Sequence, residues 1–293
     1  MGDYVFVNEK IPRPFFTRLC ASDRTQVTRN HPPVAGVDAL DHGTMHPGLC
    51  LAFGDLNGVD FWRNRGRIKH FRFTKEPVVT EGRLKFAVEE QYLAPNGTEV
   101  CRGNNVFCFV DGKTLQPPQS GTLLMWNTTL KSDDRPLEFG PQHEMGLAFR
   151  VETSIVVKNG NGRITGSHGG QNESGNWART AEWWDYSAAI DGQRKGILAV
   201  VAHDNARKFW SHSRDYGFLA INPTGPPPNR KDVPSIGFTV PKGKPFEMTF
   251  GVLMYSTTIE HASADDDNAK EVAASAQAVQ TVLKLWKRDP SQQ

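Results

Sequence analysis

The sequence predicts an all-β protein, an antiparallel β-sandwich followed by one C-terminal α-helix. First, 27 glycines and 19 prolines divide the 293 residues into short segments rich in Val, Ile, Phe, Thr and Tyr. Second, several segments alternate apolar and polar residues, the period of a half-buried antiparallel strand. Third, strand-like and helix-like segments do not alternate along the chain, which argues against a Rossmann or TIM-barrel architecture.

The strand-like segments follow one another along most of the chain. They are 4–10, 49–53, 70–79, 83–94, 99–110, 121–131, 147–158, 196–204, 216–222 and 246–256. Asn-Gly pairs in APNGTE (94–99) and KNGNGR (158–163) predict turns between strands. The Asp55–Gly58 segment (DLNG) is also expected to form a turn, and the Pro-rich stretch 224–234 is expected to be a surface loop.

A single helix is predicted near the C-terminus, over about 266–288. Its apolar residues recur at steps of three and four: Val272, Ala276, Val279, Leu283 and Trp286. Acidic residues at its start and basic residues at its end suit the helix dipole. We expect this stripe to pack on the sheet, and a subunit interface in a homo-oligomer is the alternative. We expect one domain over 1–293, with the sandwich covering about 4–260.

The composition and motifs of the chain argue against several classes of partner and site. The net charge of +2 provides no electrostatic footprint for nucleic acid or for a membrane surface. No apolar run approaches the roughly 18 residues that span a bilayer, and no secretory signal is recognised. The four cysteines lack CxxC or zinc-ligand spacing, so we expect reduced thiols and a cytoplasmic protein. Phosphate-loop, dinucleotide-binding and GxSxG motifs do not occur in the sequence.

Polar and aromatic residues that could perform chemistry gather in four segments. These are 38–62, 139–151, 176–187 and 203–225. Aromatic faces beside Asp, Asn, Arg and His suit sugar recognition, because ring C–H groups stack on Trp or Tyr while hydroxyls need paired donors and acceptors. Each residue type also has an ordinary role in turns or in the core. The clustering is what favours a site.

Six motifs occur in order over 12–256. They are HPGLCLAFGDLNGVDFW, GRIKHFRF, FGPQHEMGLAFRV, NWARTAEWWDYSAAIDG, GILAVVAHDN and FWSHSRDYGFLAINPTG. Together they resemble the DUF6807 family, whose members are often labelled "methane oxygenase PmoA family". The resemblance implies a galactose mutarotase-like β-supersandwich and a role related to sugars. The methane label does not transfer, because that enzyme subunit spans a membrane and this sequence has no spanning segment.

Two positions depart from the pattern of the family. Pro47 follows His46 where relatives commonly have arginine, and Phe53 stands where they have histidine. If those residues are needed for turnover, this chain has an altered specificity or weak catalysis.

We expect the concave face of a sheet to hold a sugar or an oxidised sugar. His46 and His212 are the candidate general acid and base, and Glu144 is a second base or orients one histidine. The candidate binding residues are Asp60, Trp62, Trp177, Trp184, Asp185, Arg214, Asp215 and Tyr216. No cofactor is required by the sequence. If a divalent metal ion is bound, its candidate ligands are His46, His143, Glu144, His203 and His212.

The leading hypothesis is a cytoplasmic carbohydrate-active enzyme that works by acid/base chemistry, through epimerisation, β-elimination or glycoside cleavage. Its partner would be a small carbohydrate. Two alternatives stay open: a non-catalytic carbohydrate-binding protein of the same fold, and an interaction protein that assembles through its C-terminal helix.

Overall fold

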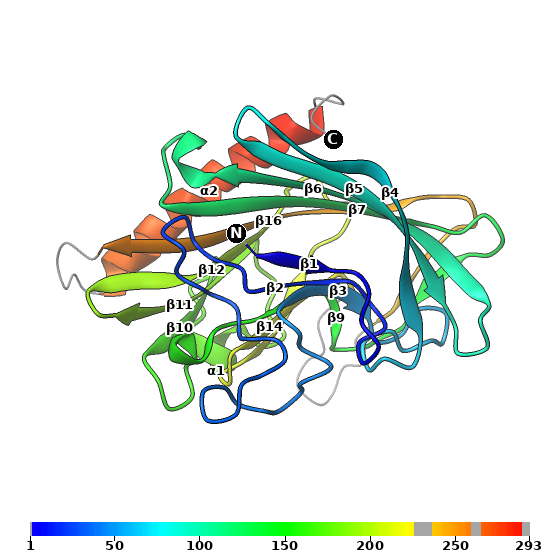
Figure 1. Ribbon diagram of the computed structural model, residues 1–293, viewed down its shortest axis with the longest axis horizontal. Helices are drawn as coiled ribbons and strands as arrows, with labels where there is room; N and C mark the ends of the chain where they lie inside the picture. The colour runs from blue at the N-terminus through cyan, green and yellow to red at the C-terminus, as the bar shows by residue number, and fades with distance from the viewer. Residues whose placement is uncertain (1, 226–235, 259–264, 289–293) are drawn as a thin grey trace.

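Two large antiparallel sheets form the body of the molecule in the computed structural model, which describes residues 2–225, 236–258 and 265–288 (Figure 1). The six-stranded sheet has the order β1 (Asp3–Val5), β2 (Phe15–Thr17), β3 (Leu49–Phe53), β9 (Met145–Arg150), β14 (Phe218–Asn222) and β13 (Trp210–Arg214). The eight-stranded sheet has the order β10 (Gly162–Gly166), β11 (Trp183–Ile190), β12 (Gln193–Val201), β16 (Phe246–Thr258), β7 (Gly121–Lys131), β6 (Glu99–Asp111), β5 (Arg83–Leu93) and β4 (Arg67–Thr80). A short sheet pairs β15 (Phe238–Val240) with β8 (Leu137–Phe139).

Helices are few among the described residues. The 3-10 turns η1 and η2 cover Gly112–Thr114 and Thr153–Ile155, and the α-helices are α1 (Asn172–Asn176) and α2 (Asp265–Arg288). The all-β fold class and the C-terminal helix are therefore confirmed. The short α1 escaped the sequence prediction, because a helix of so few residues shows no periodicity.

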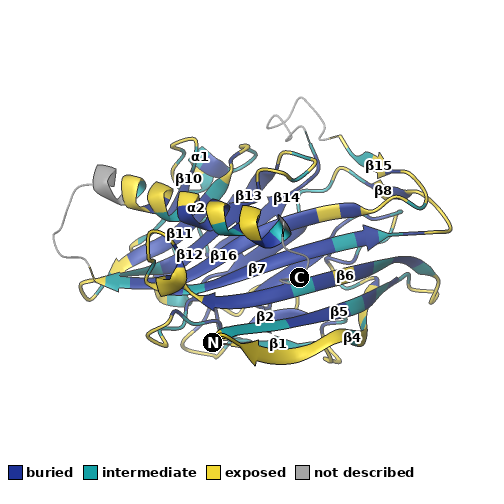
Figure 2. Cartoon of the chain, turned by 90° about the horizontal axis from the view of Figure 1, so that it is seen from above, coloured by how far each residue is buried: buried dark blue, intermediate teal, exposed yellow. Residues whose placement is uncertain are grey.

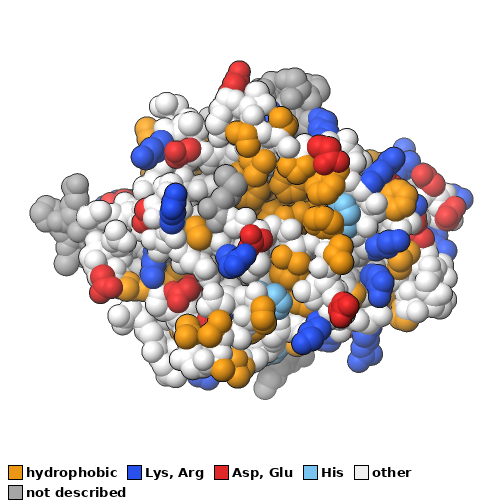
Figure 3. Space-filling model, in the orientation of Figure 1, with side chains coloured by type: hydrophobic (Ala, Val, Ile, Leu, Met, Phe, Trp, Pro, Cys, Tyr) orange, Lys and Arg blue, Asp and Glu red, His pale blue; other side chains and the backbone are white. Residues whose placement is uncertain are grey.

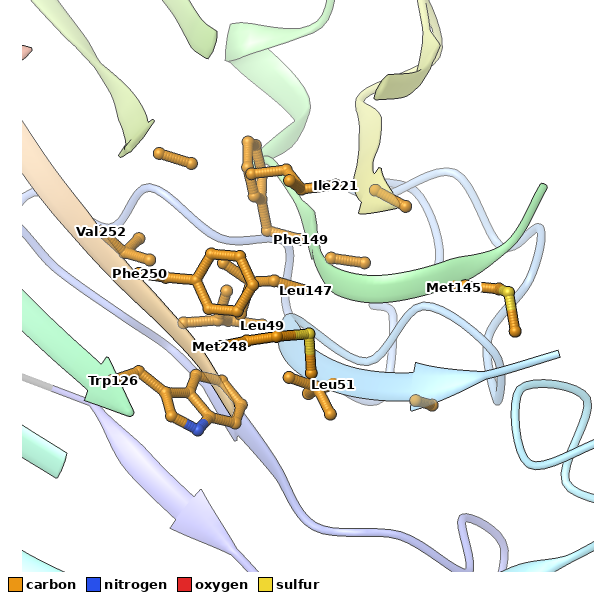
Figure 4. Packing of buried hydrophobic residues seen from close by; sticks show 14 of the residues in the cluster. Leu49, Leu51, Trp126, Met145, Leu147, Phe149, Ile221, Met248, Phe250 and Val252 are labelled. Atoms are coloured by element: carbon orange, nitrogen blue, oxygen red, sulfur yellow. The ribbon is translucent and has the colours of Figure 1, made fainter. Parts of the chain in front are cut away.

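The core fills the space between the two sheets. Leu49, Leu147 and Phe149 from the six-stranded sheet meet Phe250 and Trp126 from the eight-stranded sheet (Figure 4). Each is at most 5% exposed. Full burial of a side chain of this kind stabilises the fold by about 1.5–3 kcal/mol. Apolar residues at alternate positions of the strands thus select the inner face.

The helix α2 lies on the opposite face of the eight-stranded sheet (Figure 2). Val279 and Leu283 are fully buried there. The helix approaches β16 closely because Gly251 has no side chain: a Cβ at this position would stand 2.4 Å from Val279 Cγ1. The apolar stripe is therefore covered by the chain's own sheet.

Most predicted strands and turns are found, with differences at their ends. Asn57 and Gly58 have φ angles of 52° and 76°, as expected for the Asn-Gly turn. The strand predicted over 147–158 stops at Arg150, because Glu152 caps the turn η2 by accepting a hydrogen bond from the Ser154 backbone N–H. Most of the loop expected at 224–234 lies outside the described residues. Within the described ranges, no helix is long and apolar enough to cross a membrane.

Candidate functional site

The candidate site lies on the outer face of the six-stranded sheet. One row of register partners crosses β3, β9, β14 and β13, and its members are Cys50, Ala148, Ala220 and His212. The next row, through Leu147 and Ile221, faces the core. Neighbouring rows point to opposite faces of a sheet, so His212 points away from the core. Strand alternation thus puts His212 on the outer face of the six-stranded sheet.

His46 is held above this sheet by a single turn of chain. Its backbone N–H donates to the His42 carbonyl at 3.0 Å, and the two imidazole rings stack with centroids 4.7 Å apart. The sequence showed no helical pattern here, but this one turn still places both rings on one side. Below, the Phe218 ring stacks on His46 at 3.9 Å, and Trp62 meets it edge-on at 6.1 Å.

The His46 side chain is fully buried, and neither ring nitrogen has a hydrogen-bond partner in the part of the chain that the structure describes. Burial lowers its pKa well below the ordinary value, and the neighbouring His42 and Arg150 lower that pKa further. His46 is therefore neutral at neutral pH. Its Nε2 lies 4.0 Å from Glu144 Oε1. That distance is too long for a hydrogen bond, but catalytic contacts often tighten when a substrate binds.

Arg63 holds Glu144 in place, and sequence reasoning missed it. Its guanidinium is ion-paired with Glu144 Oε2 and with Asp60 Oδ2, the latter at 3.1 Å. Asp60 also accepts a hydrogen bond from the Arg63 backbone N–H at 2.8 Å. The i, i+3 spacing of Asp60 and Arg63 was the signal in the sequence for this ion pair. It was overlooked because Arg63 belongs to a basic run. Asp60 thus lies at the site as an orienting group for Arg63.

His212 is the centre of a second polar group. The Arg214 Nε–H donates to His212 Nε2 at 3.1 Å, and Arg214 Nη1 is ion-paired with Glu173 Oε1 at 2.5 Å. The Asp215 carboxylate accepts from the Glu173 backbone N–H at the start of α1, so Asp215 anchors that helix. Burial, the Arg214 charge and the neighbouring His143 lower the pKa of His212 to about 3. A neutral His212 is a poor general acid.

The two histidines both contact one aromatic ring. Phe218 is stacked on His46 at 3.9 Å and meets His212 at 5.8 Å, centroid to centroid. The distance between the two imidazole centroids therefore cannot exceed the sum of these two distances. His46, Glu144 and His212 thus form one constellation.

Tyr216 borders this constellation. Its ring is parallel to those of His42 and His46, at 5.6 and 6.4 Å, and the Arg150 guanidinium lies 4.6 Å from its centroid. Asp41 binds Arg150 with two hydrogen bonds of 3.0 Å and accepts from His42 at 2.7 Å. The pKa of Asp41 lies well below its ordinary value, because the bonds from Arg150 and His42 outweigh the opposing effect of burial. These contacts fix the aromatic wall.

His143 and Trp177 complete the site at the β13 edge. The His143 ring lies 5.5 Å from Trp177 and 6.1 Å from His212, and Trp177 lies 6.4 Å from His212. Trp177 follows α1 directly, as the residue that ends the helix. Its Nε1–H is buried without a partner among the described residues. Both rings are half-buried and face the same imidazole.

Three predicted residues are not brought to this site. Trp184 is fully buried in the main core. The Tyr255 hydroxyl donates a hydrogen bond to Asp185 at 2.8 Å. Because Tyr255 belongs to the layer beneath α2, Asp185 lies on the far side of the eight-stranded sheet. His203 is exposed, is paired with Glu182 and contacts α2 through its backbone. Trp62, expected at the rim, is instead fully enclosed behind His46.

The metal ligands considered from the sequence do not form a set. His203 lies with α2, away from the histidines on the six-stranded sheet. Among the residues that the structure describes, no three His, Cys, Asp or Glu side chains are grouped so that they could hold a metal ion.

A separate polar feature is buried between the sheets. Glu90 lines a small cavity with Tyr4, Phe107 and Trp126. The Tyr4 hydroxyl donates to Glu90 at 3.4 Å. Burial raises the pKa of Glu90 to about 7. Figure 3 shows hydrophobic side chains gathered in the hollow above β1, over the long strands of the eight-stranded sheet.

Among the solved structures that are similar to this chain are two with low TM-scores. One is assigned as a kojibiose phosphorylase from the human microbiome (TM-score 0.33, 6% identity); the match covers 69% of this chain and only 23% of that one. The other is a galactose mutarotase related enzyme from Lactobacillus acidophilus (TM-score 0.34, 10% identity), with 90% of this chain and 100% of that one covered.

A comparison of the sequence with curated proteins finds no match. The model of DUF6807, described as a family of unknown function, matches residues 2–268, which is most of the chain and includes every candidate site residue. The motifs that fold into this site are therefore part of the matched region, and the protein belongs to the DUF6807 family.

Proposed function

We propose that this protein is a carbohydrate-active enzyme that moves a proton with the His46–Glu144 pair. The observation that carries the proposal is the fully buried His46, whose two ring nitrogens have no partner among the described residues while a carboxylate oxygen lies 4.0 Å from Nε2. An imidazole so enclosed loses hydration at both nitrogens, and a structure accepts that cost where a ligand or a reaction step uses them.

The geometry suits proton transfer at a carbon next to a carbonyl group. A neutral imidazole donates at one nitrogen and accepts at the other. His46 can therefore pass a proton between Glu144 at Nε2 and a substrate at Nδ1. Removal of the proton leaves an enolate. Loss of an oxygen substituent from the β carbon completes an elimination, whereas an epimerisation needs a second donor that returns a proton to the opposite face. Glycoside cleavage by paired carboxylates has weaker support, because Glu144 is bound to Arg63.

The carbohydrate class is supported by the side chains around His46. Tyr216 and Trp177 offer partly exposed aromatic faces, and Glu144 and Arg63 lie on the same side of the sheet. Stacking faces beside charged hydrogen-bonding groups suit a ring with C–H faces and hydroxyl edges. The four cysteines are free thiols, which accords with the cytoplasmic location proposed from the sequence.

A non-catalytic carbohydrate-binding protein is the second candidate. The departures from the family at Pro47 and Phe53 favoured it. However, Phe53 is fully buried in the core against Phe139, with ring centroids 5.1 Å apart. The substitution at Phe53 therefore removes no group from the site. Of the two departures, only Pro47 still favours a protein that has lost catalysis.

The test is proton exchange with solvent. We would incubate the full chain with aldoses, ketoses and sugar acids in D₂O and follow deuterium incorporation at carbon by NMR. His46→Ala and Glu144→Gln should each reduce the exchange by about 10²–10⁴-fold, the usual contribution of a general acid or base. His168→Ala and Glu81→Gln change exposed residues and provide matched controls. Binding of a sugar without exchange by the wild type would favour the second candidate; exchange that survives both site variants would refute the proposed roles.

A further inference from the structure

The hydrogen bonds around His212 determine which of its nitrogens carries the proton. Arg214 cannot accept a hydrogen bond, so the contact of its Nε–H with His212 Nε2 makes that nitrogen the acceptor. A neutral imidazole has one protonated nitrogen, which must then be Nδ1. Glu173 holds Arg214 from the other side and keeps this arrangement. His212 therefore presents an Nδ1–H donor.

This donor has no acceptor among the residues that the structure describes. His212 is 5% exposed, and Nδ1 has no hydrogen-bond partner in the described ranges. The indole Nε1–H of Trp177 is in the same situation, and its ring centroid lies 6.4 Å from that of His212. An indole nitrogen is only a donor. Two buried N–H groups on neighbouring rings thus lack an acceptor, which is costly unless a ligand supplies one.

The nearby carboxylates are already engaged. Glu173 accepts from Arg214 and from the Asp215 backbone N–H. Glu144 is bound by Arg63. The charged groups that act most strongly on His212 are the cationic Arg214, His143 when it is protonated, and Arg63. The electrostatic environment of the two donors therefore favours an oxygen that carries negative charge.

We propose that His212 Nδ1–H and Trp177 Nε1–H form a subsite for a carbonyl or carboxylate oxygen of the substrate. A carbonyl or carboxylate oxygen can accept two hydrogen bonds and has no proton to donate. A hydroxyl group, in contrast, also needs an acceptor for its own proton. The substrate is thus an oxidised sugar rather than a neutral polyol. This inference rests on the proposed function: when the His46–Glu144 pair removes a proton, the negative charge of the enolate develops on the oxygen that these two donors hold.

The first experiment determines the tautomer directly. Long-range ¹H–¹⁵N NMR on the full-length ¹⁵N-labelled protein at pH 7 should show the proton of His212 on Nδ1. In Arg214→Met, which removes the donor, both tautomers should appear. A proton on Nε2 in the wild type would overturn the subsite. This result does not depend on any enzymatic activity.

The second experiment measures affinity by calorimetry for D-glucuronate, D-glucono-1,5-lactone and D-glucose. Either oxidised sugar should bind at least about tenfold more tightly than glucose, the value of one charged hydrogen bond. Trp177→Phe, which keeps an aromatic ring but removes the N–H, should reduce that preference about tenfold. A preference for glucuronate alone identifies a carboxylate, whereas tight binding of both identifies any carbonyl oxygen.

The two proposals fail in different ways. Equal binding of all three sugars, unaltered in Trp177→Phe, would overturn the subsite and leave the carbohydrate role standing. If no sugar binds, the proposed function falls. The subsite would then be judged with acetate alone, which should shift the His212 Nδ1 resonance of the wild type; no shift at saturating acetate would overturn it as well.

Discussion

Glu90 provides the sharpest test of the structure, because its burial makes stability depend on pH. This carboxyl group lies between the two sheets, 6% exposed, with the Tyr4 hydroxyl 3.4 Å away. Burial raises its pKa from 4.5 to about 7. In the unfolded chain Glu90 loses its proton near pH 4.5; in the folded chain it keeps the proton up to about pH 7. The folded state thus binds more protons between these values, and stability falls as the pH rises through them.

The magnitude follows from the size of the shift. One pKa unit corresponds to 1.36 kcal/mol, so a rise from 4.5 to about 7 costs about 3 kcal/mol at pH 8. Glu90→Gln has the shape of the protonated acid and never ionises. We expect this variant to be about as stable as the wild type at pH 4.5 and about 3 kcal/mol more stable at pH 8.

Urea unfolding at pH 4.5, 6 and 8, followed by tryptophan fluorescence, measures this difference. Glu81→Gln, in an exposed turn, is the control for loss of a carboxylate at the surface. A stability difference between Glu90→Gln and the wild type that is equal at all three pH values would refute the reasoning, because it would mean that Glu90 has the same pKa in both states.

Two further predictions concern packing and charge. Gly251→Ala should destabilise the protein by about 1–3 kcal/mol, because the new Cβ would stand 2.4 Å from Val279 Cγ1; circular dichroism in urea checks it, and an unchanged midpoint would mean that α2 does not sit so closely. Asp41→Asn should cost about 1–3 kcal/mol at pH 7, because the fully buried Arg150 loses its carboxylate partner. The pKa of Asp41 is lowered on folding, so its contribution is present above about pH 4 and is lost as the pH falls further; the two proteins should converge in acid, and a gap that persists there contradicts the ion pair.

The fold class could be predicted because its signals are local. Alternating strands, Asn-Gly turns and the helical stripe of α2 depend on residues close in sequence, and each was found. The ends of elements were less accurate: Glu152 competes with the strand after Arg150 by capping a turn. Whether a strand continues depends on whether a partner strand is present, which local sequence does not contain.

The candidate site could be predicted from the sequence only in part. His46, Glu144 and His212 were selected from the sequence, and they do lie together. Their contacts could not be foreseen, because Arg63 and Glu144 are far apart in the chain and meet only when two loops pack on one sheet. Trp184 and Asp185 looked equally promising. The alternation of β11 turned one toward the core and the other toward the layer under α2.

Residue type and short spacing were enough to predict the antiparallel sandwich, the terminal helix, the family and the histidines worth considering. Only the folded chain shows which face of which sheet carries the candidate site. It also shows that Arg214 occupies one nitrogen of His212, while both nitrogens of His46 stay unpaired among the described residues. The physical reason is that strand register and loop packing join residues distant in the chain, and these contacts, not residue type, set the protonation and partners of each side chain.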